Sequence, residues 1–229
     1  MRKDIVVLGT SGTGYDVIDT LEAINQVQPT WNILGFVDDN PALHGTEFYG
    51  YGILGGSELL LRPAYGEVAV VIAVANERNL LVRKTISERL QLAPERYPVI
   101  CHPTCVISPK TQFGPGCMML AGSATGGYAR IGSHVLVLQR SGIGHDAEVG
   151  DFVTICAHAS VAAHTRIGEG AYIATGALLR PGIRVGAASK VGIGSVVLRN
   201  VPPGKTVFGN PAAILDLGAP AVGQGKKGF

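Results

Sequence analysis

The sequence predicts two domains: a small parallel α/β domain of Rossmann type, followed by a parallel β-helix. Two patterns predict them. From Ile107 to Val197 every sixth residue is apolar with one exception, and this spacing never slips. Before residue 101, apolar strands alternate with helical stretches, which is typical of a parallel sheet covered by helices. A chain of 229 residues is long enough for both domains.

The period of six fits neither a helix, with a period near 3.6, nor a half-buried strand, with a period of 2. Hexapeptide repeats build parallel β-helices, in which three hexads form one triangular coil of about 18 residues. We call every sixth residue from Ile107 a repeat position, and Thr125 is the polar exception. We expect about five coils, with the repeat positions inside. The sixteen repeat positions are Ile107, Phe113, Met119, Thr125, Ile131, Val137, Ile143, Val149, Ile155, Val161, Ile167, Ile173, Leu179, Val185, Val191 and Val197.

Small residues and glycines flank the repeat positions. A mostly small residue stands two places before each of them, and we expect it at a crowded corner. A glycine often follows directly, as at Gly114, Gly132, Gly144, Gly150 and Gly168, and we expect these glycines to turn the backbone through positive φ. A β-sandwich is the alternative fold, but its loops vary in length and this repeat does not.

The N-terminal third has the pattern of a small parallel sheet. The predicted strands are residues 5–8, 33–37, 68–74 and a short one at 97–100, with helices at 15–27 and 79–92. Ligands of such sheets bind beyond the carboxyl ends of the strands. The glycine loop 9–14 opens a helix, so its N–H groups can hold a phosphate. Asp38 and Asp39 can accept hydrogen bonds from a sugar hydroxyl. NAD and a turn without ligand are the alternatives, but a nucleotide-sugar suits a three-stranded domain better.

Composition narrows the function and compartment. The net charge of +2 is too small to indicate nucleic-acid binding. No stretch approaches the roughly 18 apolar residues of a membrane span, and the N-terminus lacks the pattern of a signal peptide. The four cysteines lack zinc-site spacing, so we expect reduced thiols and no metal. These features predict a cytoplasmic protein.

The chain resembles the NeuD/PglD group of sugar O- and N-acetyltransferases over nearly its whole length. The resemblance rests on the glycine loop, the sequence Phe-Val-Asp-Asp at 36–39, the hexad array, its ending at 201–204 and 208–212, and Gly144-His145-Asp146. It implies a left-handed β-helix and a homotrimer with active sites between neighbouring β-helices. The implied domains are a nucleotide-sugar-binding domain at 1–101, an acetyltransferase domain at 102–217 and a disordered tail at 218–229.

The same resemblance implies an acetyl-CoA-dependent N-acetyltransferase acting on a nucleotide-linked amino-sugar, such as a UDP-linked 4-amino-deoxysugar. His145 would be the general base and Asp146 would raise its basicity. The position of His145, two residues past Ile143, faces outward, and its neighbours one coil away, Gly127 and Ala163, are small. Adjacent residues in an extended chain point apart, so Asp146 can reach His145 only across a turn. The remaining implied contacts are Ser11, Gly12, Thr13, Asp38, Asp39, Ala75 and Asn79 for the nucleotide-sugar, and Thr154, Thr175 and Ile193 for acetyl-CoA.

Three positions depart from the family pattern. Thr13 replaces a histidine of the glycine loop, Leu138-Gln139 stands where an asparagine is common, and Thr154 stands where a histidine is often seen at the CoA site. These departures concern the substrate more than the reaction class.

Other functions remain open at this point. A sugar O-acetyltransferase of the sialic-acid type and a non-catalytic nucleotide-sugar-binding β-helix fit the same residues. His134, His158 and His164 each lie three residues past a repeat position and are expected to face outward. They allow a rival interpretation as zinc ligands between subunits, as in γ-class carbonic anhydrases, but that function does not explain the N-terminal domain.

Overall fold

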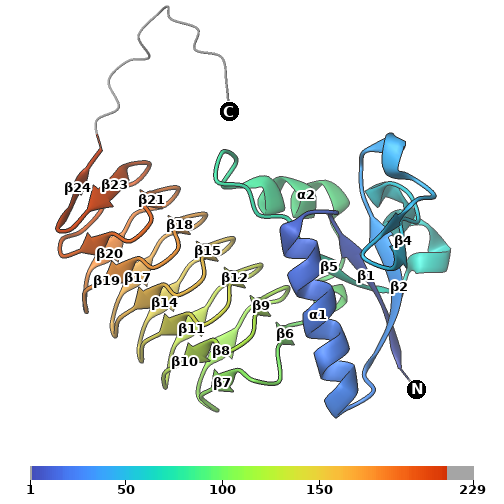
Figure 1. Ribbon diagram of the computed structural model, residues 1–229, viewed down its shortest axis with the longest axis horizontal. Helices are drawn as coiled ribbons and strands as arrows, with labels where there is room; N and C mark the ends of the chain where they lie inside the picture. Colours follow the sequence, from blue (N-terminus) through green and yellow to red (C-terminus); the bar gives the residue numbers. More distant parts are fainter. Residues whose placement is uncertain (1, 216–229) are drawn as a thin grey trace, which may run out of the picture.

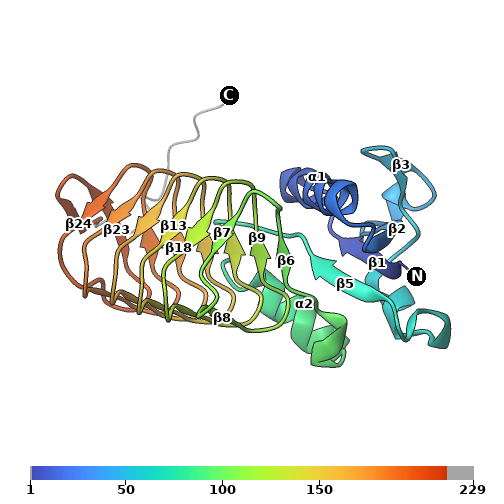
Figure 2. The same cartoon turned by 90° about the horizontal axis from the view of Figure 1, so that it is seen from below.

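The computed structural model describes residues 2–215 and consists of the two predicted domains side by side (Figure 1). The tail predicted at 218–229 lies outside the described residues. Seen from below, the α/β domain lies beside the first coils of the β-helix (Figure 2). No helix within residues 2–215 has both the length and the apolar character needed to cross a membrane.

The N-terminal domain has the three predicted parallel strands, in the order β2-β1-β5. Its larger elements are β1 (Lys3–Leu8), α1 (Gly12–Val27), β2 (Trp31–Val37), β5 (Ala69–Ile72) and α2 (Val82–Leu90). The connections contain a hairpin of β3 (Glu47–Phe48) and β4 (Tyr51–Gly52) and the 3-10 turns η1 (Pro41–Leu43), η2 (Ser57–Leu61), η3 (Pro63–Tyr65) and η4 (Pro94–Arg96). The helix α1 begins three residues earlier than predicted, directly in the glycine loop.

Alternating side chains of β1 enter two different hydrophobic clusters. Ile5 and Val7 pack with α1 in one cluster. That cluster continues onto the outer surface of the β-helix, through Met118 and Leu136. On the opposite side of the sheet, Val6 belongs to a cluster that includes α2 and η2. The apolar strand is therefore buried on both sides, and one of the two sides joins the domains.

The β-helix has three flat faces, each a parallel sheet, joined at three corners. Face 1 contains β7 (Val106–Ile107), β10 (Ala124–Thr125), β13 (Gly142–Ile143), β16 (Ser160–Val161), β19 (Leu178–Leu179) and β22 (Val196–Val197). Face 2 contains β8 (Gln112–Phe113), β11 (Arg130–Ile131), β14 (Glu148–Val149), β17 (Arg166–Ile167) and β20 (Arg184–Val185). Face 3 contains β6 (Ile100–Cys101), β9 (Met118–Met119), β12 (Leu136–Val137), β15 (Thr154–Ile155), β18 (Tyr172–Ile173), β21 (Lys190–Val191), β23 (Thr206–Gly209) and the antiparallel β24 (Ala212–Ile214).

The repeat positions point inward as predicted, and each pairs with its equivalent one coil away. Ile131 lies in register between Phe113 and Val149, for example. The polar exception, Thr125, is also buried, and its hydroxyl meets that of Thr111 at 2.7 Å. The β-helix is slightly longer than the five coils expected. The segment around Ile100, which the sequence assigned to the first domain, instead pairs with β9 and starts face 3.

The predicted role of the glycines after the repeat positions is wrong. Positive φ occurs two residues later, at the corners, at Gly116 and Gly122 but also at residues with side chains. The non-glycine corner residues in this left-handed conformation are Tyr128, His134, Arg140, Asp146, Phe152, His158, His164 and Ala188.

The glycines after the repeat positions serve close approach between coils instead. A Cβ built on Gly168 would lie 2.5 Å from the backbone nitrogen of Ala187 and 2.8 Å from its Cα. A Cβ on Gly144 would meet the nitrogen of Ala163 at 2.4 Å. Neighbouring backbone cannot move aside as a flexible side chain can, so these positions require glycine.

We therefore expect Gly168→Ala to destabilise the protein by roughly 1–3 kcal/mol, because the added methyl group overpacks the backbone of the next coil. Gly142→Ala is the control, since a Cβ there meets nothing within 4 Å. Urea unfolding followed by circular dichroism measures both. Equal midpoints for the two variants would contradict close approach as the reason for glycine.

A buried arginine on α2 connects the two domains. Arg83 is 1% exposed, and its guanidinium donates to the carbonyl oxygens of Val74 (2.9 Å), His134 (3.1 Å) and Phe152 (2.7 Å) and to the hydroxyl of Thr154 (2.9 Å). Burial lowers its pKa to about 10, so it remains protonated at neutral pH. One cation thus joins the segment after β5 to two successive coils of the β-helix.

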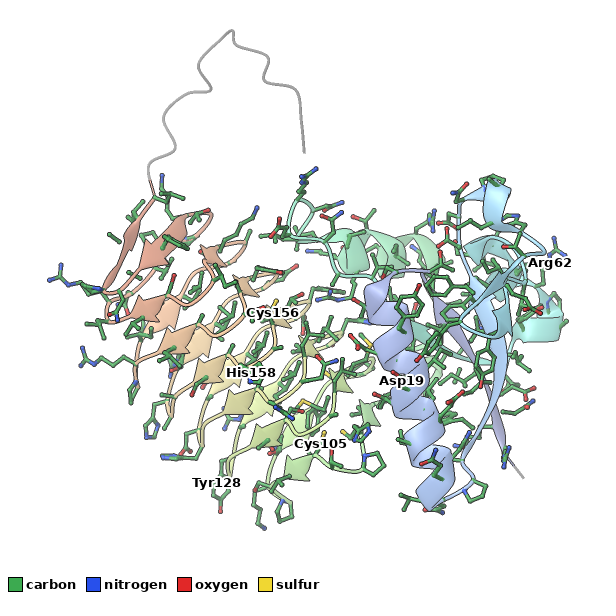
Figure 3. The ribbon with its side chains drawn as sticks, in the orientation of Figure 1. Asp19, Arg62, Cys105, Tyr128, Cys156 and His158 are labelled. Carbon is green, nitrogen blue, oxygen red and sulfur yellow. The ribbon has the colours of Figure 1, made fainter. Side chains whose placement is uncertain are left out.

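Arg83→Met should cost on the order of 3 kcal/mol, since each buried carbonyl left without a donor costs ~1–3 kcal/mol. Arg62, an exposed arginine of the same domain (Figure 3), provides the control. We expect Arg62→Met to change stability by less than ~0.5 kcal/mol. Chemical unfolding of both variants measures the difference, and a wild-type midpoint for Arg83→Met would refute the connecting role.

Candidate functional site

His145 and Asp146 lie on the corner between faces 1 and 2, in the turn that joins β13 to β14. Asp146 has a φ of 56°, so the chain bends between the two side chains instead of continuing extended. The bend places Nδ1 of His145 2.7 Å from a carboxylate oxygen of Asp146. The turn that the sequence argument required is therefore present. Because Nδ1 is engaged, Nε2 of the exposed ring is the nitrogen available for proton transfer.

A second histidine stands next to this pair. The ring of His164 lies perpendicular to that of His145, with centroids 5.0 Å apart. Its backbone nitrogen donates to the carbonyl oxygen of His145 at 3.0 Å. Sequence reasoning named Ala163 as the neighbour one coil later and did not place His164 there. The available signal was the 18-residue spacing between Asp146 and His164, which puts both on the same corner.

A polar hollow of about 270 Å³ opens beside this corner. Within it Glu148 lies between two arginines, 3.7 Å from Arg130 and 3.4 Å from Arg166, so the local charges are largely compensated. The lining residues are Tyr128, Arg130, Asp146, Glu148, His164 and Arg166. Asp146 and His164 therefore border a hollow large enough for part of a ligand, beside His145.

The glycine loop forms the predicted start of a helix. Ser11 is the N-cap of α1, but its hydroxyl donates to the carbonyl of Ala73 at 3.2 Å and does not cap the helix. Space beside Gly12 is open, because a Cβ built there would meet nothing within 4 Å. Thr13 follows in the first turn. An uncapped first turn next to open space is suited to bind an anion through backbone N–H groups.

The two aspartates after β2 have different partners. Asp38 accepts from the backbone and the hydroxyl of Thr10, at 3.0 and 2.6 Å. Asp39 accepts from the backbone of Ser57 at 2.8 Å and pairs with Arg89 at 2.6 Å. Burial alone would raise the pKa of both carboxyls, but these hydrogen bonds outweigh it and lower the pKa. Both are ionised at neutral pH, and Asp39 also links α2 to the start of η2.

The third predicted segment, residues 75–79, lies at the same edge of the sheet. The nitrogen of Ala73 donates to the carbonyl of Leu8 at 2.8 Å, and Gly9 packs closely against Val74. Ala75 follows directly, and Asn79 closes a turn on Asn76 before α2. The seven nucleotide-sugar candidates thus lie in the segments that follow the carboxyl ends of β1, β2 and β5, at one edge of the sheet.

Two of the three acetyl-CoA candidates share a groove on face 3. Thr175 and Ile193 line a groove of about 360 Å³ together with Glu77, which comes from the loop after β5. Thr154 lies elsewhere. It is 5% exposed, and its hydroxyl accepts the hydrogen bond from Arg83, so its side chain is part of the domain contact.

The candidate base and the nucleotide end of the chain lie on opposite sides of the β-helix. The α/β domain packs on face 3, through Met118 and Leu136, whereas His145 occupies the corner between faces 1 and 2. In a triangular coil this corner is opposite face 3. Figure 3 shows Tyr128, which shares the corner column of Asp146, at the edge of the β-helix away from α1. A single chain therefore does not bring the base to its own nucleotide loop.

The prediction that the three other corner histidines face outward is correct for His158 and His164 but wrong for His134. His134 is 4% exposed, because the α/β domain covers its corner. Its ring stacks on Phe152 and meets the edge of Tyr97. Burial, with a smaller contribution from Arg83, lowers its pKa to about 4. His134 is therefore neutral in the folded protein and unavailable to a metal between subunits.

His134 should make stability depend on pH. An unfolded histidine binds a proton near pH 6.5, but this one does so only near pH 4, so its stabilising effect is complete above about pH 6.5 and declines as the pH falls. Between pH 7 and 5 the wild type should lose on the order of 1–2 kcal/mol more than His134→Phe. Phenylalanine suits the corner, since Phe152 adopts the same backbone conformation one coil later. Urea unfolding at the two pH values measures this, and parallel losses would contradict the assignment.

Comparisons with known proteins agree with this architecture. Residues 4–90 match the PglD N-terminal domain family. The acetyltransferase domain of PglB from Neisseria gonorrhoeae FA1090 is 28% identical, with a TM-score of 0.82 over 93% of this chain and 100% of that one. A structure of that domain in complex with acetyl coenzyme A matches equally well. WeeI from Acinetobacter baumannii AYE is 29% identical, with a TM-score of 0.79 over 93% of this chain and 100% of its own.

PerB from Caulobacter crescentus, solved in complex with CoA and GDP-perosamine, has a TM-score of 0.82 over 94% of this chain and 99% of its own. At 24% identity it supports the fold alone. No curated protein sequence matches the chain significantly.

The fold and the corner histidine, together with these similarities, define the class of the protein as an acyltransferase with a hexapeptide-repeat β-helix. The first domain narrows the class further. Residues 4–90 match the PglD N-terminal domain family, and this match bears out the resemblance to the NeuD/PglD group that the sequence predicted.

Proposed function

We propose that the protein transfers an acetyl group from acetyl-CoA to the amine of a nucleotide-linked amino-sugar, with His145 as general base. The observation that carries the proposal is the 2.7 Å contact between His145 and Asp146 on an exposed corner of an acetyltransferase-type β-helix. Similarity to the PglB domain, which has been solved with acetyl coenzyme A, supports the acyl donor. The PglD-type first domain supports a nucleotide-sugar as acceptor.

The histidine–aspartate pair is suited to the proton transfers of this reaction. The carboxylate of Asp146 holds the ring with Nδ1 protonated and stabilises the cation that forms. Nε2 then accepts a proton from the amine as its nitrogen bonds to the thioester carbon. When the carbon–sulfur bond breaks, the same nitrogen returns the proton to the departing thiolate. No net change of His145 occurs over the cycle.

The proposed binding residues divide the substrates between the two domains. Ser11, Gly12, Thr13, Ala75 and Asn79 border the phosphate and sugar positions beyond the sheet, and Asp38 and Asp39 add ionised acceptors at the same edge. Acetyl-CoA is proposed for the groove with Thr175 and Ile193. Because Thr154 is buried against Arg83, its part in this site is limited to supporting the backbone.

The proposal requires more than one copy of the chain. His145 lies opposite face 3, so the base that serves one nucleotide loop has to come from a neighbouring β-helix. We propose a homotrimer, in which each corner between faces 1 and 2 meets the groove of the next subunit. A cytoplasmic location completes the proposal, since that compartment supplies acetyl-CoA and nucleotide-sugars.

Acetyl transfer should depend on His145 and on a nucleotide-linked amine. Thiol release from acetyl-CoA is measured with a panel of UDP-, GDP- and dTDP-linked amino-sugars, with a UDP-linked 4-amino-deoxysugar tested first. We expect His145→Ala to lower kcat by roughly 10²–10⁴-fold. Asp146→Asn should have a smaller effect, because asparagine tolerates the left-handed conformation and still contacts Nδ1.

His102→Ala is the matched control, since the ring of His102 hydrogen-bonds with Thr104 alone among the described residues. The N-acetyltransferase proposal fails if no amino-sugar accelerates thiol release, or if His145→Ala keeps the wild-type rate. Acceleration by a hydroxylated sialic-acid acceptor alone would indicate an O-acetyltransferase instead. Binding of nucleotide-sugars without any turnover would indicate a non-catalytic protein.

A further inference from the structure

Three potential metal ligands converge on the corner between faces 1 and 2. His145, Asp146 and His164 each offer one ligand atom, and these atoms lie within 4.8 Å of one another. All three side chains are exposed. Two imidazoles and a carboxylate at such separation match the donor types of zinc sites with three protein ligands and an open position.

The backbone holds the three residues in place before any ligand arrives. Asp146 and His164 are equivalent corner residues of successive coils, with φ angles of 56° and 59°. The nitrogen of Asp146 donates to the carbonyl of Gly127 at 2.9 Å, and that of His164 to the carbonyl of His145 at 3.0 Å. The stacking of coils therefore fixes the spacing of the ligands, and little order has to be gained on binding.

The donor set selects the kind of ion. Calcium and magnesium prefer oxygen ligands, of which this cluster offers a single carboxylate. Imidazole nitrogen suits zinc and its transition-metal neighbours. The nearest cationic side chains, Arg130 and Arg166, are both paired with Glu148, which reduces their repulsion of a bound cation.

We propose that His145, Asp146 and His164 form a binding site for a divalent transition-metal ion of the zinc type, and that the bound ion inhibits the protein. The inhibition, unlike the binding, rests on the proposed function. A metal bound to His145 and Asp146 occupies the carboxylate and a ring lone pair of the catalytic pair, so proton transfer from the amine stops. The sequence predicts no metal because the cysteines lack zinc-site spacing and because three histidines between subunits do not explain the first domain. Neither argument concerns a site made of two histidines and an aspartate within one chain.

The binding is tested on the full chain after treatment with a chelator. Cobalt is added, its visible absorption is recorded, and zinc is then used to displace it. We expect each chain to bind one equivalent of cobalt. His164→Ala should weaken binding by at least the roughly 10–100-fold that loss of a second-shell contact causes. Alanine suits this corner, since Ala188 adopts the same backbone conformation.

His158→Ala is the matched control, because His158 is exposed at the equivalent place on another corner and should bind cobalt like the wild type. Absence of a stoichiometric cobalt spectrum, or an unchanged affinity in His164→Ala, would overturn the site. These readouts do not depend on catalysis, so they remain valid if the proposed acetyl transfer fails.

Inhibition is tested separately by thiol release with increasing zinc. We expect zinc to inhibit the wild type and a chelator to reverse it. With each rate normalised to the zinc-free rate of the same variant, His164→Ala should resist the zinc concentrations that inhibit the wild type. Equal inhibition of the wild type and His164→Ala, or stoichiometric binding without inhibition, would refute the inhibitory role.

Discussion

The vertical register of the coils is the constraint on which the rest of the structure depends. From β6 to β22 each strand residue pairs with the residue 18 positions away, as Ile131 pairs with Val149, and the last coil shortens this spacing to 16, as Val191 pairs with Val207. The glycines after the repeat positions allow this register, since a Cβ on Gly168 would strike the backbone of the next coil. Because the 18-residue register holds from β6 to β22, corner residues also stack in columns. The proximity of Asp146 and His164 is a direct result.

A second constraint joins the β-helix to the first domain. Arg83 has no carboxylate among its hydrogen-bond partners and binds carbonyl oxygens from the segment after β5 and from two coils instead. Removing a guanidinium from water is costly, and the several hydrogen bonds offset that cost only while both domains stay in place. The nucleotide end of the sheet is thereby held at a fixed position relative to face 3. In the trimer that we propose, the neighbouring subunit would supply the base for this position.

Regular features of the structure could be predicted from the sequence, and contacts between distant segments could not. The hexad spacing predicts the inward residues, and alternating strands and helices predict the sheet. The burial of His134 has no local signal, because it results from the first domain covering one corner of three. A glycine after a repeat position can serve either a positive φ angle or close approach between two backbones, and the sequence alone does not distinguish these two reasons. His145 was identified from the family motif, whereas His164 required the geometry of the corner.

The left-handed corners affect which residues of such a protein can be substituted during evolution. Eight of them in the described residues carry a side chain rather than glycine, and these include tyrosine, histidine, arginine, aspartate and alanine. On the corner between faces 1 and 2 the side chains of Tyr128, Asp146 and His164 are exposed, so their identity is nearly independent of the residues that hold the coil together. Functional side chains can therefore change along this corner while the buried residues at the repeat positions stay the same. A β-helix of this kind can therefore gain or lose functional side chains at a corner without any change in its buried core.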